Sequence, residues 1–188
     1  MKELLLLLMC VIALTSMTAD AFGQDTSGVG YGTGVAVRPN NEPDMAALRV
    51  KACGTDKVDY DAETKKDQHA APDGPEAPAD KALIYAMRTT IIGYKIHSKL
   101  AVDGKWMGTN RGKTYFFFTL DPGEHHFCSE SENQDAMTMY VEPGKTYYIQ
   151  QQVKARMWKA RTRLEVLNEA KGKEELQDLN LSVFTVKK

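Results

Sequence analysis

The residues of this chain that could do chemistry are its histidines, its cysteines and one basic stretch. His125 and His126 are adjacent, so in a strand their side chains point to opposite faces and do not share one metal ion. His69 lies in a proline-rich segment, His97 stands alone, and no two histidines have the i, i+4 spacing of a helical metal site. The sequence therefore predicts no metal site and no cofactor.

Nucleophilic catalysis is not indicated by any motif. The sequence has no Gly-x-Ser-x-Gly elbow, and Cys128, although close to two histidines, is better explained as half of a disulfide. We predict no catalytic residue. A catalytic triad assembles from distant positions, so a hydrolase stays open as an alternative.

Cysteine usage indicates an oxidising compartment. The chain has three cysteines, of which Cys10 lies in an apolar N-terminal segment, leaving Cys53 and Cys128. We expect these two to form a disulfide, which would stabilise the fold by about 3 to 4 kcal/mol through loop closure. Two buried free thiols are the alternative.

Residues 1–23 are typical of a secretory signal peptide. Lys2 precedes an apolar run from Leu4 to Leu14, and Ala19-Asp20-Ala21 is a small-x-small cleavage signal. Cys10 follows Leu8-Met9 as in a lipoprotein box, but cleavage there would leave too short a signal. No later window approaches the roughly 20 apolar residues of a membrane span. We expect an exported protein, periplasmic or extracellular, with no transmembrane helix after cleavage.

A basic stretch is the strongest candidate for binding. Lys154 to Arg163 reads KARMWKARTR, with five basic residues interleaved with Met157 and Trp158 between two predicted strands. Such a segment can meet anionic lipid headgroups, phosphate-bearing glycans or an acidic protein face. The predicted contact residues are Lys154, Arg156, Trp158, Lys159 and Arg161.

A second connection, Thr89 to Ile96, is unusually apolar for a loop, with Ile91, Ile92 and Tyr94 around Gly93. The alternative for both connections is that their side chains only cover an open end of the fold. The net charge of −1 gives no global field that would recruit nucleic acid, so an electrostatic partner must be met locally. The sequence does not decide whether the two connections share one end.

Strands must position these residues. From Ala82 onward, short runs rich in aromatic and β-branched residues are separated by turn signals. The runs are Ala82 to Arg88, Ser98 to Asp103, Thr114 to Leu120, Glu124 to Ser131, Ala136 to Glu142, Thr146 to Lys154, Thr162 to Leu167 and Leu181 to Val186. Asn168 to Leu179 is typical of a short amphipathic helix. The pattern predicts a mainly β fold, an antiparallel β-sandwich or small barrel, with one short C-terminal helix.

Turn residues and strand faces add detail. Asp103-Gly104 predicts a tight hairpin, and Asp121-Pro122-Gly123 and Glu142-Pro143-Gly144 predict type II turns. In Thr146 to Lys154, only Gln151 breaks the apolar face. Phe116 to Phe118 place large apolar side chains on both faces of their strand. This predicts a central strand whose outer face is covered, for instance by the N-terminal segment.

The chain divides by composition into four parts. After the signal peptide we expect a flexible Gly/Pro-rich lead over residues 24–47 and an N-terminal extension over 48–80. The extension would contain two short strands between Leu48 and Tyr60 and a Pro-rich spacer from Asp67 to Lys81. Residues 81–188 would form the β-sandwich domain.

Five phrases carry a family resemblance: KALIYAMR, LAVDGKWMG, TYFFFTLDPGEHHFCSES, VEPGKTYYIQQQV and LEVLNEAKGKEEL. With them, the region from about Lys81 to Leu179 resembles the domain of unknown function 2846 (DUF2846) family of exported bacterial proteins. The VDG and PGEH phrases are also similar to those of PEGA-type surface β modules. The resemblance implies a sandwich fold and an envelope location. It brings no established activity, so no catalytic residue is carried over.

We therefore expect a non-enzymatic β-sandwich module that binds or scaffolds at the bacterial cell envelope. Its partner would be an anionic lipid headgroup, a glycan or a protein, and not nucleic acid. One alternative is an envelope hydrolase or glycan-processing enzyme with a pocket between the sheets. Another is a structural subunit of an envelope assembly, which predicts an exposed edge strand or a large apolar patch.

Overall fold

The computed structural model describes residues 34–69, 74–156 and 159–187. The chain divides into two units, residues 1–30 and 31–188, and every described residue belongs to the second. The predicted signal peptide over residues 1–23, the lead up to residue 33 and Trp158 lie outside the described residues.

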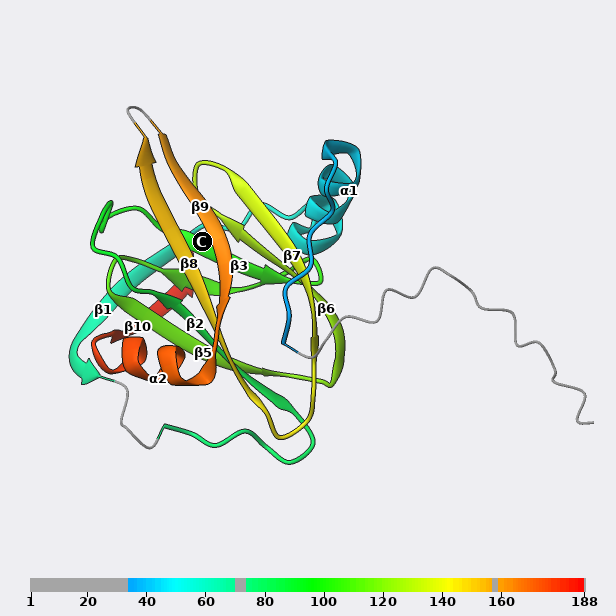
Figure 1. The fold of residues 1–188 in the computed structure, drawn as a ribbon. Coiled ribbons are helices and arrows are strands. Elements are labelled where there is room, and N and C mark those ends of the chain that lie inside the picture. The colour runs from blue at the N-terminus through cyan, green and yellow to red at the C-terminus, as the bar shows by residue number, and fades with distance from the viewer. Residues whose placement is uncertain (1–33, 70–73, 157–158, 188) are drawn as a thin grey trace, which may run out of the picture. The chain divides into compact units, whose positions relative to one another are not determined.

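The described residues form two sheets and two helices (Figure 1). One sheet has six strands in the order β1-β10-β5-β2-β8-β9, and the other has four in the order β4-β3-β6-β7. The strands are β1 Tyr60–His69, β2 Ala82–Arg88, β3 Ser98–Val102, β4 Lys105–Asn110, β5 Thr114–Leu120, β6 Gly123–Glu130, β7 Gln134–Val141, β8 Thr146–Arg156, β9 Lys159–Leu167 and β10 Asn180–Val186. The helices are α1 Glu42–Cys53 and α2 Glu169–Gln177. The predicted mainly β fold with a short C-terminal helix is confirmed, and these sheets do not close into a barrel.

The six-stranded sheet is mixed rather than wholly antiparallel. β2 pairs in parallel with β8, and β10 with β5, whereas the other pairs in this sheet are antiparallel. The two Pro-Gly turns each pass the chain from one sheet to the other, from β5 to β6 and from β7 to β8. Gly144 has the positive φ of 68° that a type II turn needs, whereas Gly123, at φ 141°, already begins β6.

The tight hairpin predicted at Asp103-Gly104 joins β3 to β4. Both residues have positive φ, 49° and 77°, as the primed two-residue turn requires. The partner strand β4, with the sequence KWMGTN, was missing from the predicted runs because it has no alternating apolar pattern.

Two apolar layers hold the fold together. Between the sheets, Ile84, Leu100, Phe127, Met137 and Ile149 belong to one buried cluster. On the other face of the six-stranded sheet, α2 and the residues after it cover three tyrosines. This second cluster contains Tyr85, Tyr115, Tyr148, Leu176 and Leu179.

The outer face of β5 is covered in part by the C-terminal helix α2. Tyr115 packs in the cluster below α2, while Phe117 remains 43% exposed. Helix α2 packs closely against Tyr148 of β8 because Gly172 has no side chain. A Cβ at that position would lie 2.1 Å from the Tyr148 ring. Ala77 of the N-terminal extension also packs against this cluster, so the N-terminal segment contributes to the cover beside α2.

Helix α1 replaces the first short strand expected in the N-terminal extension. The Asn41 side chain accepts a hydrogen bond from Asp44 N and caps the helix. Met45, Leu48 and Ala52 have the i, i+3, i+7 spacing of one helical face, and they pack with Ala101 and the two cysteines. The strand prediction was wrong because a short apolar run fits either period. Strand β1 begins at Tyr60 and continues to His69, inside the expected spacer.

Candidate anion-binding face of the β8–β9 hairpin

The basic stretch predicted as a loop is mostly strand. β8 and β9 form a long two-stranded ribbon (Figure 1), with only residues 157–158 between the strand ends. The backbone register pairs Lys154 with Arg161 and Arg156 with Lys159. Four of the five predicted contact residues therefore form two cross-strand pairs of like charge, and the fifth, Trp158, lies outside the described residues.

Strand alternation separates the ribbon into a buried face and a basic face. Gln151, Val153, Thr162 and Leu164 are buried. Lys154, Arg161 and Arg163 are exposed, and none of the three has an ion pair or side-chain hydrogen bond within the described part of the chain. We call these three residues the basic face. Arg163 was not singled out from the sequence, although its two-residue spacing from Arg161 places both on one side of a strand.

Two hollows adjoin the basic face. The larger, of about 590 Å³, is lined by residues 34–36, Arg38, Lys154, Arg163 and neighbouring β8 and β9 residues. The smaller, of about 390 Å³, is lined by Arg38, Lys154, Arg161, Arg163, Asn133, Asp135 and Thr162. Lys154 and Arg163 line both hollows, as does Arg38, while Glu165 lines the larger and Asp135 the smaller.

Asp135 does not neutralise the charge of the basic face, because its carboxylate is paired with Arg38 and accepts a hydrogen bond from the β9 backbone. Arg38 Nη2 donates to Asp135 Oδ2 at 3.2 Å and to Leu164 O at 2.5 Å. The same Asp135 oxygen accepts from Leu164 N at 2.7 Å. Both partners of this ion pair are largely buried, with side chains 24% and 18% exposed. Sequence reasoning missed this pair because the two residues lie 97 positions apart.

Side chains also cap the outer edge of β9. Asn133 accepts from Thr162 N at 2.6 Å and donates to Thr162 O at 3.2 Å. The lead pairs with the edge of β7, where Val37 and Thr138 exchange two backbone hydrogen bonds at 2.9 and 3.0 Å. From Gly34 onward the lead thus has defined backbone partners, in contrast to the flexible path expected from its composition.

The apolar connection lies at the same end of the six-stranded sheet as the tip of the ribbon. β2 and β8 are parallel, with Met87 opposite Gln150, so the chain leaves β2 in the direction in which β8 continues. Gln150 Nε2 donates to Thr89 Oγ1 at 2.5 Å, which ties the start of the connection to β8. The apolar connection and the basic stretch therefore share one end of the fold, which the sequence did not decide.

A buried arginine holds this connection. Arg88 is fully buried, and its guanidinium donates to Ile92 O at 2.9 Å, to Gly93 O at 2.6 Å and to Ile96 O. Burial lowers the pKa of Arg88 to about 10, so the group stays protonated at neutral pH. Ile91, Ile92 and Tyr94 remain exposed.

Gln151, which interrupts the apolar face of β8, joins the two sheets through hydrogen bonds. Its amide nitrogen donates to Ser98 O, Lys99 O and Ser129 Oγ at 3.2, 3.1 and 2.9 Å, and its oxygen accepts from Asn110 Nδ2 at 3.0 Å. Ser129 in turn bonds Thr162 Oγ1 at 2.7 Å. The break in the apolar pattern is therefore a satisfied buried polar network at the base of the ribbon.

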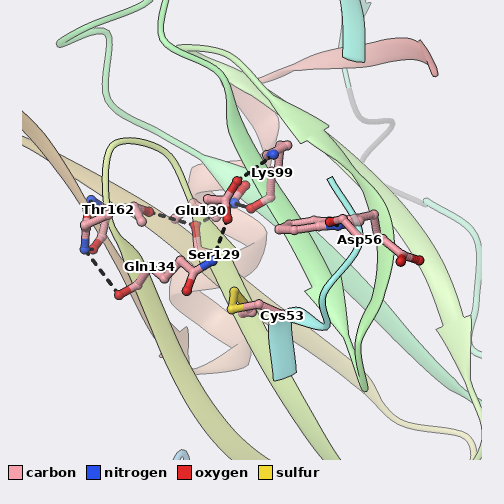
Figure 2. Close-up of a disulfide and its surroundings, with 11 residues drawn as sticks. Cys53, Asp56, Lys99, Ser129, Glu130, Gln134 and Thr162 are labelled. Atoms are coloured by element: carbon pink, nitrogen blue, oxygen red, sulfur yellow. Dashed lines mark hydrogen bonds and ion pairs between the residues drawn. A yellow bond between two sulfur atoms is a disulfide. The ribbon is translucent and has the colours of Figure 1, made fainter. Parts of the chain in front are cut away.

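Cys53 and Cys128 form a disulfide in the structure, with sulfurs 1.98 Å apart, which joins α1 to β6 (Figure 2). Beside it, Lys99 Nζ lies 2.6 Å from Glu130 Oε1, donates to Val58 O at 2.9 Å, and is 4.6 Å from the centre of the Trp106 ring. These contacts fix the segment that leaves α1 against the four-stranded sheet.

A separate hollow of about 440 Å³ is lined by titratable groups, among them Tyr60, His97, Lys99 and Glu130. Burial, helped by the charges of Arg111 and Arg88, lowers the pKa of His97. Burial alone would raise the pKa of Glu130, but hydrogen bonds from Lys99 and Gln134 outweigh it and hold that pKa below its usual value. Lys99 and Glu130 neutralise each other, which leaves neither free to act as acid or base.

The two adjacent histidines diverge as predicted. His125 Nδ1 lies 2.6 Å from Asp103 Oδ2, whereas His126 Nδ1 lies 2.9 Å from Thr138 Oγ1. Among the residues that the structure describes, no three His, Cys, Asp or Glu side chains come together to hold a metal ion. Within the same residues, neither helix has the length and apolar character needed to cross a bilayer.

Comparison with known proteins finds a family but no activity. Residues 78–161 match the family described as Protein of unknown function (DUF2846), which confirms the predicted resemblance over that range. A protein of Haemophilus influenzae, described only as uncharacterized, is 32% identical over 102 residues, covering 53% of this chain and 60% of that protein. No solved structure matches the chain.

Proposed function

We propose that this protein, whose residues 78–161 match the DUF2846 family, is a non-enzymatic module that binds an anionic component of the bacterial cell envelope. It would be exported by the signal peptide predicted over residues 1–23 and would act in the periplasm or outside the cell. The basic face of the β8–β9 ribbon is the binding surface. This proposal gives the protein a binding role and assigns no reaction to it.

One observation carries the proposal: Lys154 and Arg161 are exposed cross-strand partners of like charge, and neither has an acidic partner among the described residues. Like charges directly opposite on neighbouring strands are destabilising, with cross-strand pairs worth about 0.2 to 1 kcal/mol. A bound anion would remove this repulsion. Arg163 extends the same face, and the backbone register adds the Arg156–Lys159 pair.

The surroundings of the basic face also favour an external anion. Asp135, an acid that lines the adjoining hollow, already accepts hydrogen bonds from Arg38 and from Leu164 N. Glu165 accepts a hydrogen bond from Gln152, the cross-strand partner of Arg163. Arg38 neutralises Asp135, whereas Glu165 keeps its charge because Gln152 is neutral. The basic face therefore has three cations beside one acid, and the excess of positive charge is left for a ligand.

The two alternatives receive less support. For a hydrolase, the hollow beside His97 offers titratable groups, but Lys99 and Glu130 are paired with each other at 2.6 Å. For a structural subunit that assembles through sheet edges, two of the four edge strands, β9 and β7, already have partners: Asn133 caps β9, and the lead pairs with β7 at Val37, whereas β1 and β4 form the other two edges. The edges at β9 and β7 are therefore not free templates for a second chain.

The test is sedimentation of the exported protein with an envelope fraction from the source bacterium. Lys154→Ala/Arg161→Ala should reduce the bound fraction, and raised salt should reduce binding of the unchanged protein because ions screen the charges. Lys57→Ala/Lys105→Ala is the matched control, since both lysines are exposed and lie outside the ribbon. Equal binding by both double variants would contradict the proposal.

A further inference from the structure

Three apolar side chains project from the connection between β2 and β3, residues 89–97, which we call the apolar loop. Ile91 is 69% exposed, Ile92 is 53% exposed and Tyr94 is 50% exposed. Together they form the densest group of large exposed apolar side chains along the described sequence. Exposed apolar residues that gather in this way, rather than singly, mark an interaction surface.

The apolar loop is held in a fixed shape at a cost in desolvation. Arg88 is fully buried and has no carboxylate within ion-pair distance among the residues described. Burying a charge is unfavourable unless hydrogen bonds compensate, and here the compensating acceptors are three carbonyls of the loop itself: Ile92, Gly93 and Ile96. The guanidinium therefore fixes the backbone that carries the exposed side chains.

A second connection supports the loop from below. Gly112 N donates to Tyr94 O at 3.1 Å, and a Cβ at Gly112 would lie 2.8 Å from the Tyr94 backbone. The Arg111 guanidinium lies 5.8 Å from the centre of the Tyr94 ring. The ring thus has a cation beside it and half of its surface in solvent.

The charges at this end of the six-stranded sheet are strongly biased. Segments 88–98, 111–114 and 154–163 contain two, two and five Lys or Arg residues, nine together, and no Asp or Glu. Neighbouring segments add three acids: Asp178 before β10, Glu132 next to Asn133, and Asp67 near the end of β1, which pairs at His69 with Asn180. Lys95 belongs to the apolar loop and Arg111 lies beside its Tyr94 ring, and the tip of the β8–β9 ribbon lies at the same end of the sheet.

We infer that the apolar loop inserts into the interfacial layer of a lipid bilayer that carries anionic headgroups. Aliphatic side chains, a tyrosine and flanking cations are the combination that binds at a membrane interface, where the apolar groups enter the acyl boundary and the cations meet the headgroups. A preformed loop loses little conformational entropy on insertion. The inference rests on the proposed function, because it identifies the anionic envelope component as lipid.

Vesicle binding of the exported protein tests the inference. The probes are phosphatidylcholine vesicles with and without phosphatidylglycerol. The protein should bind the anionic vesicles, and Ile91→Ser/Ile92→Ser should bind them about tenfold more weakly, since two apolar side chains no longer enter the interface. Val50→Ser/Val186→Ser is the matched control, because these valines are 65% and 62% exposed on other elements.

A second measurement reports insertion directly. An environment-sensitive fluorophore on Ile91→Cys should shift to shorter emission wavelength with anionic vesicles, whereas the same label on Val50→Cys should not. Binding to anionic vesicles with no shift at position 91 and no loss for the isoleucine variant would overturn the inference while leaving the proposed function intact. Binding to envelope fractions but to no vesicle would also overturn it, because the partner would then be a protein or glycan. Loss of vesicle binding in the isoleucine variant, together with unchanged envelope binding in Lys154→Ala/Arg161→Ala, would support the inference and contradict the function assigned to the ribbon.

Discussion

Lys154 of β8 and Arg161 of β9 are directly opposite each other, both exposed, and neither contacts an acid within the described residues. Such a pair is unfavourable for the isolated fold and favourable for an anionic ligand. Stability and binding should therefore respond in opposite directions when the charge of one partner is reversed.

Lys154→Glu should stabilise the protein by about 0.2 to 1 kcal/mol, because it turns a repulsive cross-strand pair into an attractive one. Denaturant unfolding at low salt measures this difference, and the gain should shrink as salt screens the pair. Lys57→Glu changes the net charge equally at an exposed site outside the ribbon and should change stability little. A loss of stability in Lys154→Glu would show that the pair is not repulsive.

Gln151→Met should destabilise the protein by about 2 to 4 kcal/mol. The substitution keeps the approximate size of the side chain but leaves Ser129 Oγ and the carbonyls of Ser98 and Lys99 without this donor in a buried site. Gln152→Met, one position along, is the control and should change the unfolding free energy far less, because that side chain is only half-buried. Equal effects at the two positions would mean that the network adds nothing to stability.

Replacing the disulfide by Cys53→Ala/Cys128→Ala should lower the free energy of unfolding by about 4 kcal/mol, since the bond closes a long loop. The sequence separation is 75 residues. The bond itself is checked by intact mass: reduction should add about two hydrogens to the exported protein. Unchanged mass under denaturing reduction would show that the thiols are free.

Stability should fall on mild acidification because of a buried histidine. Burial lowers the pKa of His126 below its ordinary 6.5, with the charge of Lys51 acting in the same direction. The unfolded chain thus binds a proton more readily than the folded protein, so this contribution is complete above pH 6.5 and declines as pH falls toward the folded pKa.

The check on this pH effect is His126→Asn, which keeps a polar group beside Thr138 and removes the titration. Its unfolding free energy should depend less on pH between about 7.5 and 5.5 than that of the unchanged protein. His97, whose pKa burial also lowers, should preserve part of the slope. Identical profiles would exclude His126 as a source of the effect.

The sequence predicts the strands whose pattern is local and strong. Ala82–Arg88 and Thr114–Leu120 have the predicted boundaries, and the Asp103-Gly104 turn follows from its need for positive φ. Asn168 caps α2 by accepting from Lys171 N. In each case neighbouring residues alone determine the structure.

The parts that sequence reasoning missed depend on distant partners. The parallel pairing of β2 with β8 arises from crossovers between sheets, which short turn motifs do not specify. Arg38 joins the candidate site through Asp135 and the Leu164 carbonyl, both far along the chain. The isolated polar residue Gln151 was visible as an anomaly, but its partners lie on other strands.

The equilibrium affinity of a charge-reversed ribbon for native envelope fragments decides whether the basic face is the binding surface. Lys154→Glu/Arg161→Glu should bind at least about tenfold more weakly than the unchanged protein and with a weaker dependence on salt, because the attraction comes from these cations. Lys57→Glu/Lys105→Glu, with the same change in net charge, should retain near-normal affinity. If the ribbon variant binds as well as that control at every salt concentration, the basic face is not the binding surface.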